Sequence, residues 1–114
     1  LPQLIAARRT LDLDPATGEL VLDDRFEFEG DALEVEEGLV TWLPVRVESE
    51  CAIVQGEHHD LKICVVQPDG AHMVVQSFGE ECKANLREGV LQRLAIQLPR
   101  GTSLVKLRMT PIKK

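Results

Sequence analysis

The sequence predicts an all-β fold, an antiparallel β-sandwich of about eight to nine short strands. Apolar residues mostly alternate with polar ones, turn residues recur at regular intervals, and no long helical pattern is present. Because there is no room for crossover helices, a parallel α/β sheet is excluded, and an antiparallel sandwich or barrel is left. The 114 residues are 44% hydrophobic and 28% charged, which is typical of one globular domain with a substantial core.

A β-hairpin is expected near the start of the chain. Leu11 and Leu13 alternate with polar residues before the loop 14–18, and Leu20 and Leu22 continue the pattern after it. Alternation on both sides of a loop that contains Pro and Gly is typical of a hairpin.

The residues before this hairpin are expected to lie outside the sandwich. We assign residues 9–114 to the β-sandwich domain and residues 1–8 to a linker or the remnant of a preceding domain. Leu4–Arg9 is a helical candidate, although it is too short to be stable alone. Because the chain opens at Leu1 without a methionine, we expect a fragment of a longer protein.

The middle of the chain contains further strands. They are expected at Leu39–Leu43, at Val45–Val54 (one strand or a pair broken near Ser49), at Leu61–Val65 and at His72–Phe78. Between the last two lies a turn, in which Pro68 presets φ and Gly70 supplies a positive φ. We expect His72–Phe78 to return from this turn as the partner of the preceding strand.

The last third begins with a segment that does not resemble a strand. Gly79–Gly89 is predicted to be a loop of about ten residues, with a possible helical turn at Lys83–Glu88, and loops of this length are often functional. Strands then follow at Leu94–Leu98 and from Val105 onwards, joined by the turn 99–102. Pro111 is expected to end the final strand.

Three cysteines leave at least one thiol unpaired, and no CxxC spacing is present. Cys51 and Cys64 lie in segments that we expect to pair as a hairpin. A turn centred near Glu57–His58 would place Cys51 opposite Val65 rather than Cys64, so we expect buried free thiols. This expectation weakly disfavours an oxidising compartment.

The charge balance argues against nucleic acid as a partner. The chain has 13 basic and 19 acidic residues and a net charge of −6, whereas phosphate binding needs a basic surface. No apolar run of about 18 residues occurs, so we expect no membrane span. We also expect no cofactor, since the usual nucleotide-binding and zinc-protease motifs are missing.

The densest polar group is Glu57-His58-His59-Asp60, between two strands. In an extended segment His58 and Asp60 would share one face, where they could act as metal ligands or as a base and its orienting carboxylate. A third ligand is not identifiable, with His72 only a candidate. The alternative is a solvated hairpin loop, and we assign no metal site.

Other polar and aromatic residues also have two interpretations. Trp42 can be a core residue or can stack on a sugar ring. The carboxylates of Asp12, Asp14 and Asp23-Asp24 can be a solvated face or, less simply, calcium ligands.

Several stretches resemble one known family. They are Asp24-Arg25-Phe26-Glu27-Phe28-Glu29-Gly30, Leu39-Val40-Thr41-Trp42-Leu43-Pro44-Val45, Arg9-Thr10-Leu11-Asp12-Leu13-Asp14 with Gly18-Glu19-Leu20, and the closing segment Ser103–Pro111. Together they resemble the C-terminal β-sandwich region of heparinase II/III-like polysaccharide lyases. The resemblance extends from about Arg8 to Pro111.

The resemblance implies an accessory domain of a lyase that cleaves uronic-acid-containing polysaccharides by β-elimination. The partners would be an N-terminal helical domain of the same parent chain and, through the parent enzyme, an acidic polysaccharide. It also implies a periplasmic or secreted parent enzyme, and the sequence itself leaves the compartment open.

The residues of this chain are not expected to catalyse that reaction. β-Elimination needs a general base and acid, usually Tyr and His, and the chain contains no Tyr. Many relatives carry histidines where this sequence has Ala32 or Leu33, and Thr41. We therefore assign no catalytic residue, and name Thr41, His58 and Asp60 as candidate substrate-binding residues.

Two alternatives to the lyase domain stay open. One is a free-standing carbohydrate- or protein-binding sandwich, with a site at Trp42 or in the loop Gly79–Gly89. The other is a small metal-dependent enzyme that uses His58, His59, Asp60 and His72. A domain that packs on a partner is expected to expose an apolar patch.

Overall fold

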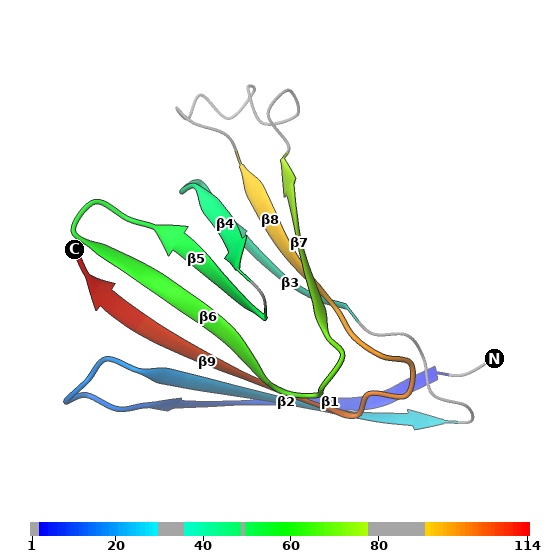
Figure 1. Cartoon of the computed structure of the whole chain (residues 1–114). Helices are drawn as coiled ribbons and strands as arrows, with labels where there is room; N and C mark the ends of the chain where they lie inside the picture. Colours follow the sequence, from blue (N-terminus) through cyan, green and yellow to red (C-terminus); the bar gives the residue numbers. More distant parts are fainter. Residues whose placement is uncertain (1–2, 30–35, 49, 78–90) are drawn as a thin grey trace.

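The computed structural model describes residues 3–29, 36–48, 50–77 and 91–114, which form nine strands and no helix (Figure 1). The strands are β1 (Gln3–Leu13), β2 (Leu20–Glu29), β3 (Glu36–Thr41), β4 (Val45–Glu48), β5 (Cys51–Gln55), β6 (His59–Gln67), β7 (His72–Ser77), β8 (Gln92–Gln97) and β9 (Leu104–Lys113). The predicted all-β antiparallel fold is confirmed. In this part of the chain no helix is long and apolar enough to cross a membrane.

The strands form two antiparallel sheets. One has six strands in the order β1-β2-β9-β6-β5-β4, and the other has three in the order β3-β8-β7. Figure 1 shows the sheets close together where β6 turns into β7, and further apart toward the start of β8 and the end of β9. The described part of the sandwich is therefore wedge-shaped, with one closed end and one open end.

The predicted N-terminal hairpin is confirmed, and it is longer than expected. β1 pairs with β2 from Gln3 onwards, so the short helix considered for Leu4–Arg9 is wrong, and residues 3–8 extend the sheet. The turn closes as its sequence suggests: Asp14 Oδ1 accepts a hydrogen bond from the Ala16 N–H at 2.9 Å, and Gly18 has a φ of 75°.

The predicted turn 67–70 is present, with Gly70 at a φ of 82°, but it does not close a hairpin. β6 is already paired on both edges, with β5 and β9, so β7 has no edge to join. The turn instead carries the chain to the other sheet, where β7 pairs with β8. The expectation that β7 pairs with β6 was therefore wrong.

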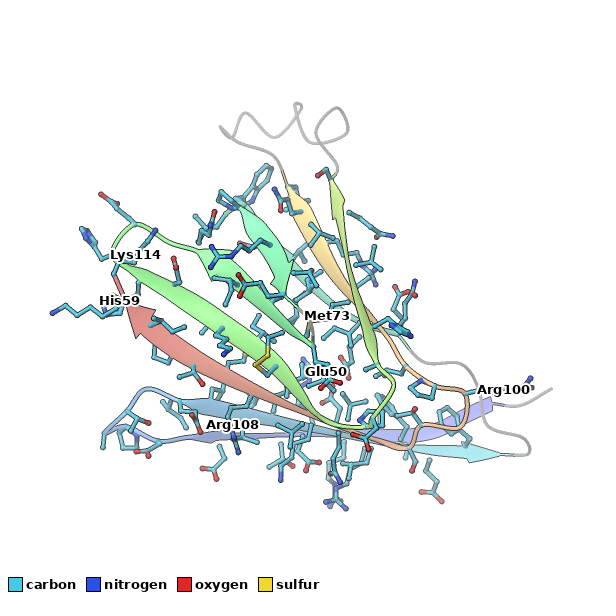
Figure 2. The ribbon with its side chains drawn as sticks, in the orientation of Figure 1. Glu50, His59, Met73, Arg100, Arg108 and Lys114 are labelled. Carbon is cyan, nitrogen blue, oxygen red and sulfur yellow. A yellow bond between two sulfur atoms is a disulfide. The ribbon has the colours of Figure 1, made fainter. Side chains whose placement is uncertain are left out.

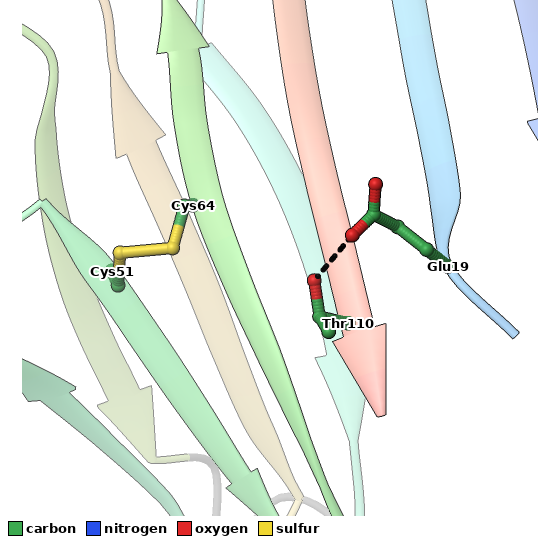
Figure 3. Close-up of a disulfide and its surroundings, with 4 residues drawn as sticks. All are labelled: Glu19, Cys51, Cys64 and Thr110. Atoms are coloured by element: carbon green, nitrogen blue, oxygen red, sulfur yellow. Dashed lines mark hydrogen bonds between the residues drawn. A yellow bond between two sulfur atoms is a disulfide. The ribbon is translucent and has the colours of Figure 1, made fainter. Parts of the chain in front are cut away.

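The last strand does not stop at Pro111. β9 continues to Lys113 beside β6, with Pro111 opposite Leu61. Its backbone pairing with β2 ends at Met109. Pro111 therefore lies beyond the last residue that pairs with β2, where its missing N–H costs no hydrogen bond to that strand. Just past this pairing, the Thr110 hydroxyl donates a hydrogen bond to Glu19 Oε2 at 3.2 Å (Figure 3).

The core lies between the sheets. The largest fully buried side chains are Leu94, Ile96, Val105 and Leu107, two from β8 and two from β9. Each occupies the inward phase of its strand, because successive side chains point to opposite faces. These four residues join the two sheets by apolar packing.

Cys51 and Cys64 form a disulfide, and the expectation of free thiols was wrong for this pair (Figure 3). The predicted hairpin is present, but its register places Cys51 opposite Cys64 rather than Val65. The hairpin is centred between Glu57 and His58, as expected, but this centre opposes Cys51 to Cys64; only a centre at His58 itself would oppose Cys51 to Val65. Cys82 lies outside the described residues.

Removing this disulfide is expected to lower the stability of the domain. A cross-link with a sequence separation of 13 restricts the unfolded chain, so Cys51→Ser/Cys64→Ser should cost about 2 kcal/mol in the free energy of unfolding. Urea denaturation of the oxidised protein and of the variant measures the difference. Thiol titration of the unreduced, denatured protein should find at most one free thiol of the three, and three would contradict the pairing.

Candidate functional site

A cavity of about 500 Å³ opens between the sheets at the wide end of the wedge. Its apolar walls come from both sheets, with Leu39 and Leu94 on one side and Val54, Leu61 and Met109 on the other. Ligand sites in proteins commonly measure about 300–1,000 Å³ and are mostly apolar with a few placed polar groups. By size and lining, this cavity is the candidate binding site of the described chain.

Three polar residues line the same cavity, and two of them are sequence candidates. Thr41 comes from the end of β3, and His59 and Asp60 from the start of β6. The structure therefore brings Thr41 and Asp60 to one site although 18 residues lie between them in the sequence. His59 was named from the sequence only for the metal-dependent enzyme, not as a substrate-binding residue.

Local hydrogen bonds hold these two candidates in place. Thr41 Oγ1 accepts the Leu43 N–H at 3.0 Å, where the chain passes from β3 toward β4. Asp60 Oδ1 accepts the Gly56 N–H at 3.3 Å and lies 3.3 Å from Lys114 Nζ. Figure 2 shows Lys114 beside His59 at this end of the sheet. These contacts restrict the rotamers of the Thr41 and Asp60 side chains, which holds both in place in the cavity wall.

His58 does not join the site. It lies in the turn before β6, where its Nε2 is 3.8 Å from Glu57 Oε1, and more than four-fifths of each side chain is exposed. The turn is tight at Gly56, since a Cβ there would collide with the carbonyl oxygen of His59. The solvated-loop interpretation therefore fits His58, while Asp60 binds back to this turn.

The histidines do not gather around a metal. His72 lies on β7, in the other sheet. Across residues 3–29, 36–48, 50–77 and 91–114, no three His, Cys, Asp or Glu side chains are close enough to hold a metal ion.

An apolar side chain is exposed at the opening of the cavity. Leu43 lines the cavity and is 46% exposed. Val40 also borders it, but its side chain lies in the outward phase of β3 with Glu36, opposite to Leu39. Trp42, which precedes Leu43, is half-buried. We refer to Leu43 and the polar residues Thr41, His59 and Asp60 as the mouth.

A second polar cluster lies between the sheets, away from the cavity, and the sequence analysis missed it. Arg9 on β1 binds Asp24 on β2 through two hydrogen bonds of 2.8 Å, and its guanidinium also lies 3.5 Å from Glu37 Oε2 on β3. Asp24 and Glu37 are buried, at 4% and 6% exposure. This cluster joins the two sheets through a pair of carboxyl groups.

The pKa values of the two carboxyl groups shift in opposite directions. Two hydrogen bonds from Arg9 lower the pKa of Asp24. Burial, with a hydrogen bond and the negative charge of Asp24, raises the pKa of Glu37 to about 7. Glu37 Oε1 is buried and accepts no hydrogen bond within the described residues, as expected for a protonated carboxyl group near neutral pH.

Other sequence candidates lie outside the described residues. These are the loop Gly79–Gly89 with its predicted helical turn at Lys83–Glu88, and the positions Ala32 and Leu33 that the resemblance singled out. Comparison with protein-family models and with curated proteins found no match to this chain.

Proposed function

We propose that this chain is a non-catalytic accessory β-sandwich that binds a neighbouring domain through its mouth. The observation that carries this proposal is the open apolar cavity, whose rim exposes Leu43. Exposed apolar residues clustered at a concave site are typical of interaction surfaces. The few polar residues there can fix the orientation of the bound surface.

We infer that the neighbouring domain is the helical domain of a heparinase II/III-like lyase. The sequence resemblance from about Arg8 to Pro111 supports this inference, as does the absence of tyrosine from the chain, which leaves β-elimination to residues elsewhere. In this arrangement Thr41 and Asp60 would face the join between the domains, where the polysaccharide passes.

A free-standing protein- or carbohydrate-binding module is the second candidate. It is favoured by Trp42, which is half-buried and lies in sequence between the cavity-lining residues Thr41 and Leu43. A ligand in the cavity would change the fluorescence of this single tryptophan. The mostly apolar walls fit side chains of a protein better than a sugar, which needs hydrogen bonds.

A matched pair of variants tests docking through the mouth. Leu43 and Val74 are both exposed apolar residues, but only Leu43 lines the cavity. Leu43→Glu should weaken binding to the helical domain at least about tenfold, because a carboxylate is placed in an apolar contact. Val74→Glu should leave the affinity unchanged.

The measurement needs the coding sequence upstream of Leu1 in the source gene. If it encodes a helix-rich domain, that domain and this chain are expressed separately and their affinity is measured by calorimetry. No helix-rich region upstream, or equal affinities for Leu43→Glu and the unmodified chain, would overturn the proposal. A tryptophan shift on adding a glycan or peptide to the chain alone would favour the second candidate.

A further inference from the structure

The first strand of the six-stranded sheet has a free edge. Within the described residues β1 pairs only with β2 and ends the sheet, and every residue from Ala6 to Leu13 is exposed. A long exposed edge presents unpaired N–H and C=O groups to which another strand can bind. β1 has 11 residues and no proline, and its irregularity lies between Leu4 and Ala6, which leaves the rest regular.

The hairpin determines which backbone groups point to this edge. The Asp14 N–H donates to the Glu19 carbonyl at 2.9 Å, so Asp14 faces the hairpin partner. Because alternate residues of a strand direct their backbone groups to opposite sides, Arg8, Thr10 and Asp12 also face β2. The backbone groups of Ala7, Arg9, Leu11 and Leu13 therefore point to the free edge.

We propose that β1 pairs with β1 of a second copy of this chain, antiparallel and centred on Thr10, so that two six-stranded sheets become one. In this register Arg9 faces Leu11 of the second copy, and Ala7 faces its Leu13. These four residues are the ones whose backbone groups point outward, so each makes its ladder hydrogen bonds. The two copies are related by a twofold axis, which makes the interface self-complementary.

The charges on the outer face favour this register. Arg8 faces Asp12 of the second copy and Asp12 faces its Arg8, at non-hydrogen-bonded positions where side chains lie closest. Neither residue has an ion-pair partner in the described part of its own chain. A centre at Arg9 would oppose two arginines, and a centre at Leu11 would oppose Asp12 to a threonine.

The inner face also gains from this pairing. Leu11 and Leu13 point inward but are 57% and 59% exposed, because they extend past the smaller sheet. In the dimer the Arg9 side-chain stem of the second copy covers Leu11, and its Ala7 lies beside Leu13. No residue of β1 lines the cavity, so a result against the dimer leaves the proposed docking function untouched, and the reverse also holds.

A charge exchange tests the interface. By sedimentation equilibrium the unmodified chain should dimerise reversibly, and Arg8→Asp or Asp12→Arg should each raise the dissociation constant at least about tenfold. The double variant should return it to within about threefold of the original value. Both positions are exposed, and unchanged circular dichroism checks the folding. A monomer up to about 1 mM, or a double variant no better than the single ones, would overturn the proposal.

A cross-link tests the register directly. Paired Thr10 residues would have Cα atoms about 4.5 Å apart, within the range that a disulfide spans. In a Cys82→Ser background, Thr10→Cys should become a disulfide-linked dimer on mild oxidation. Thr17→Cys, an exposed threonine of the hairpin turn, is the control and should stay monomeric. Equal cross-linking at both positions would contradict the register.

Discussion

We expect Glu37→Gln to make the protein more stable at pH 8 by about 3 kcal/mol, and to leave its stability at pH 4.5 nearly unchanged. Burial raises the pKa of Glu37 from 4.5 to about 7, so between these values the folded protein binds a proton that the unfolded chain releases. Stability therefore falls as the pH rises through this range. Glutamine has the size of the protonated side chain and cannot lose that proton, so the fall should disappear.

The acid side of the same profile is expected to have the opposite slope. Arg9 lowers the pKa of Asp24, so the stability contributed by Asp24 is present above its unfolded pKa and is lost as the pH falls through the folded one. The unmodified protein should therefore be most stable between the two transitions, in mildly acidic solution.

Urea denaturation at intervals from pH 3 to pH 8 measures both transitions. Glu36→Gln is the control, because it removes the neighbouring carboxylate on the exposed side of β3, where Glu36 pairs with Arg93 at 2.6 Å. The fall in stability above pH 4.5 should persist in this control. A Glu37→Gln profile that still falls as steeply as the original would mean that Glu37 is already ionised in the fold.

The strands and turns could be predicted because their signals are local. The alternation around Leu20 and Leu22, and the Pro and Gly at 68 and 70, act within a few residues. Which strands pair is a property of the whole sheet, however. β7 looked like the partner of β6 until the structure showed both edges of β6 occupied.

The buried cluster could not be assembled from the sequence, although it left a signal there. Asp24 occupies the inward phase of β2 between Leu22 and Phe26, and Arg9 shares the phase of Leu11. A charge in an apolar phase indicates a buried polar contact. Its partners come from three strands and two sheets, so spacing alone does not identify them.

The candidate site was half predicted for the same reason. Thr41 was chosen by resemblance and Asp60 by its polar neighbours, and the fold brings both to one cavity. The cavity itself depends on how far the two sheets diverge, and the alternation of apolar and polar residues does not predict that distance.

Because the sheets diverge, a leucine packed between them and a leucine at the mouth should differ in what they contribute to stability. Leu107 is fully buried between the sheets, so Leu107→Ala removes a large side chain from a packed site and should cost about 3 to 4 kcal/mol in the free energy of unfolding. Leu43 is 46% exposed at the mouth, where its side chain already meets solvent, and Leu43→Ala should cost less than about 1 kcal/mol. Urea denaturation of both variants makes the comparison with the same substitution.

The difference between these two leucines separates a core from a binding surface. If the mouth is open in the isolated chain, losing Leu43 leaves no cavity behind, and its side chain is available to a partner. Equal losses for Leu107→Ala and Leu43→Ala would instead mean that the mouth is filled by the chain itself, so that the cavity could not receive another domain. If a helical domain docks at the mouth as proposed, the cost of Leu43→Ala in the complex should rise toward that of a buried leucine, because the complex covers it.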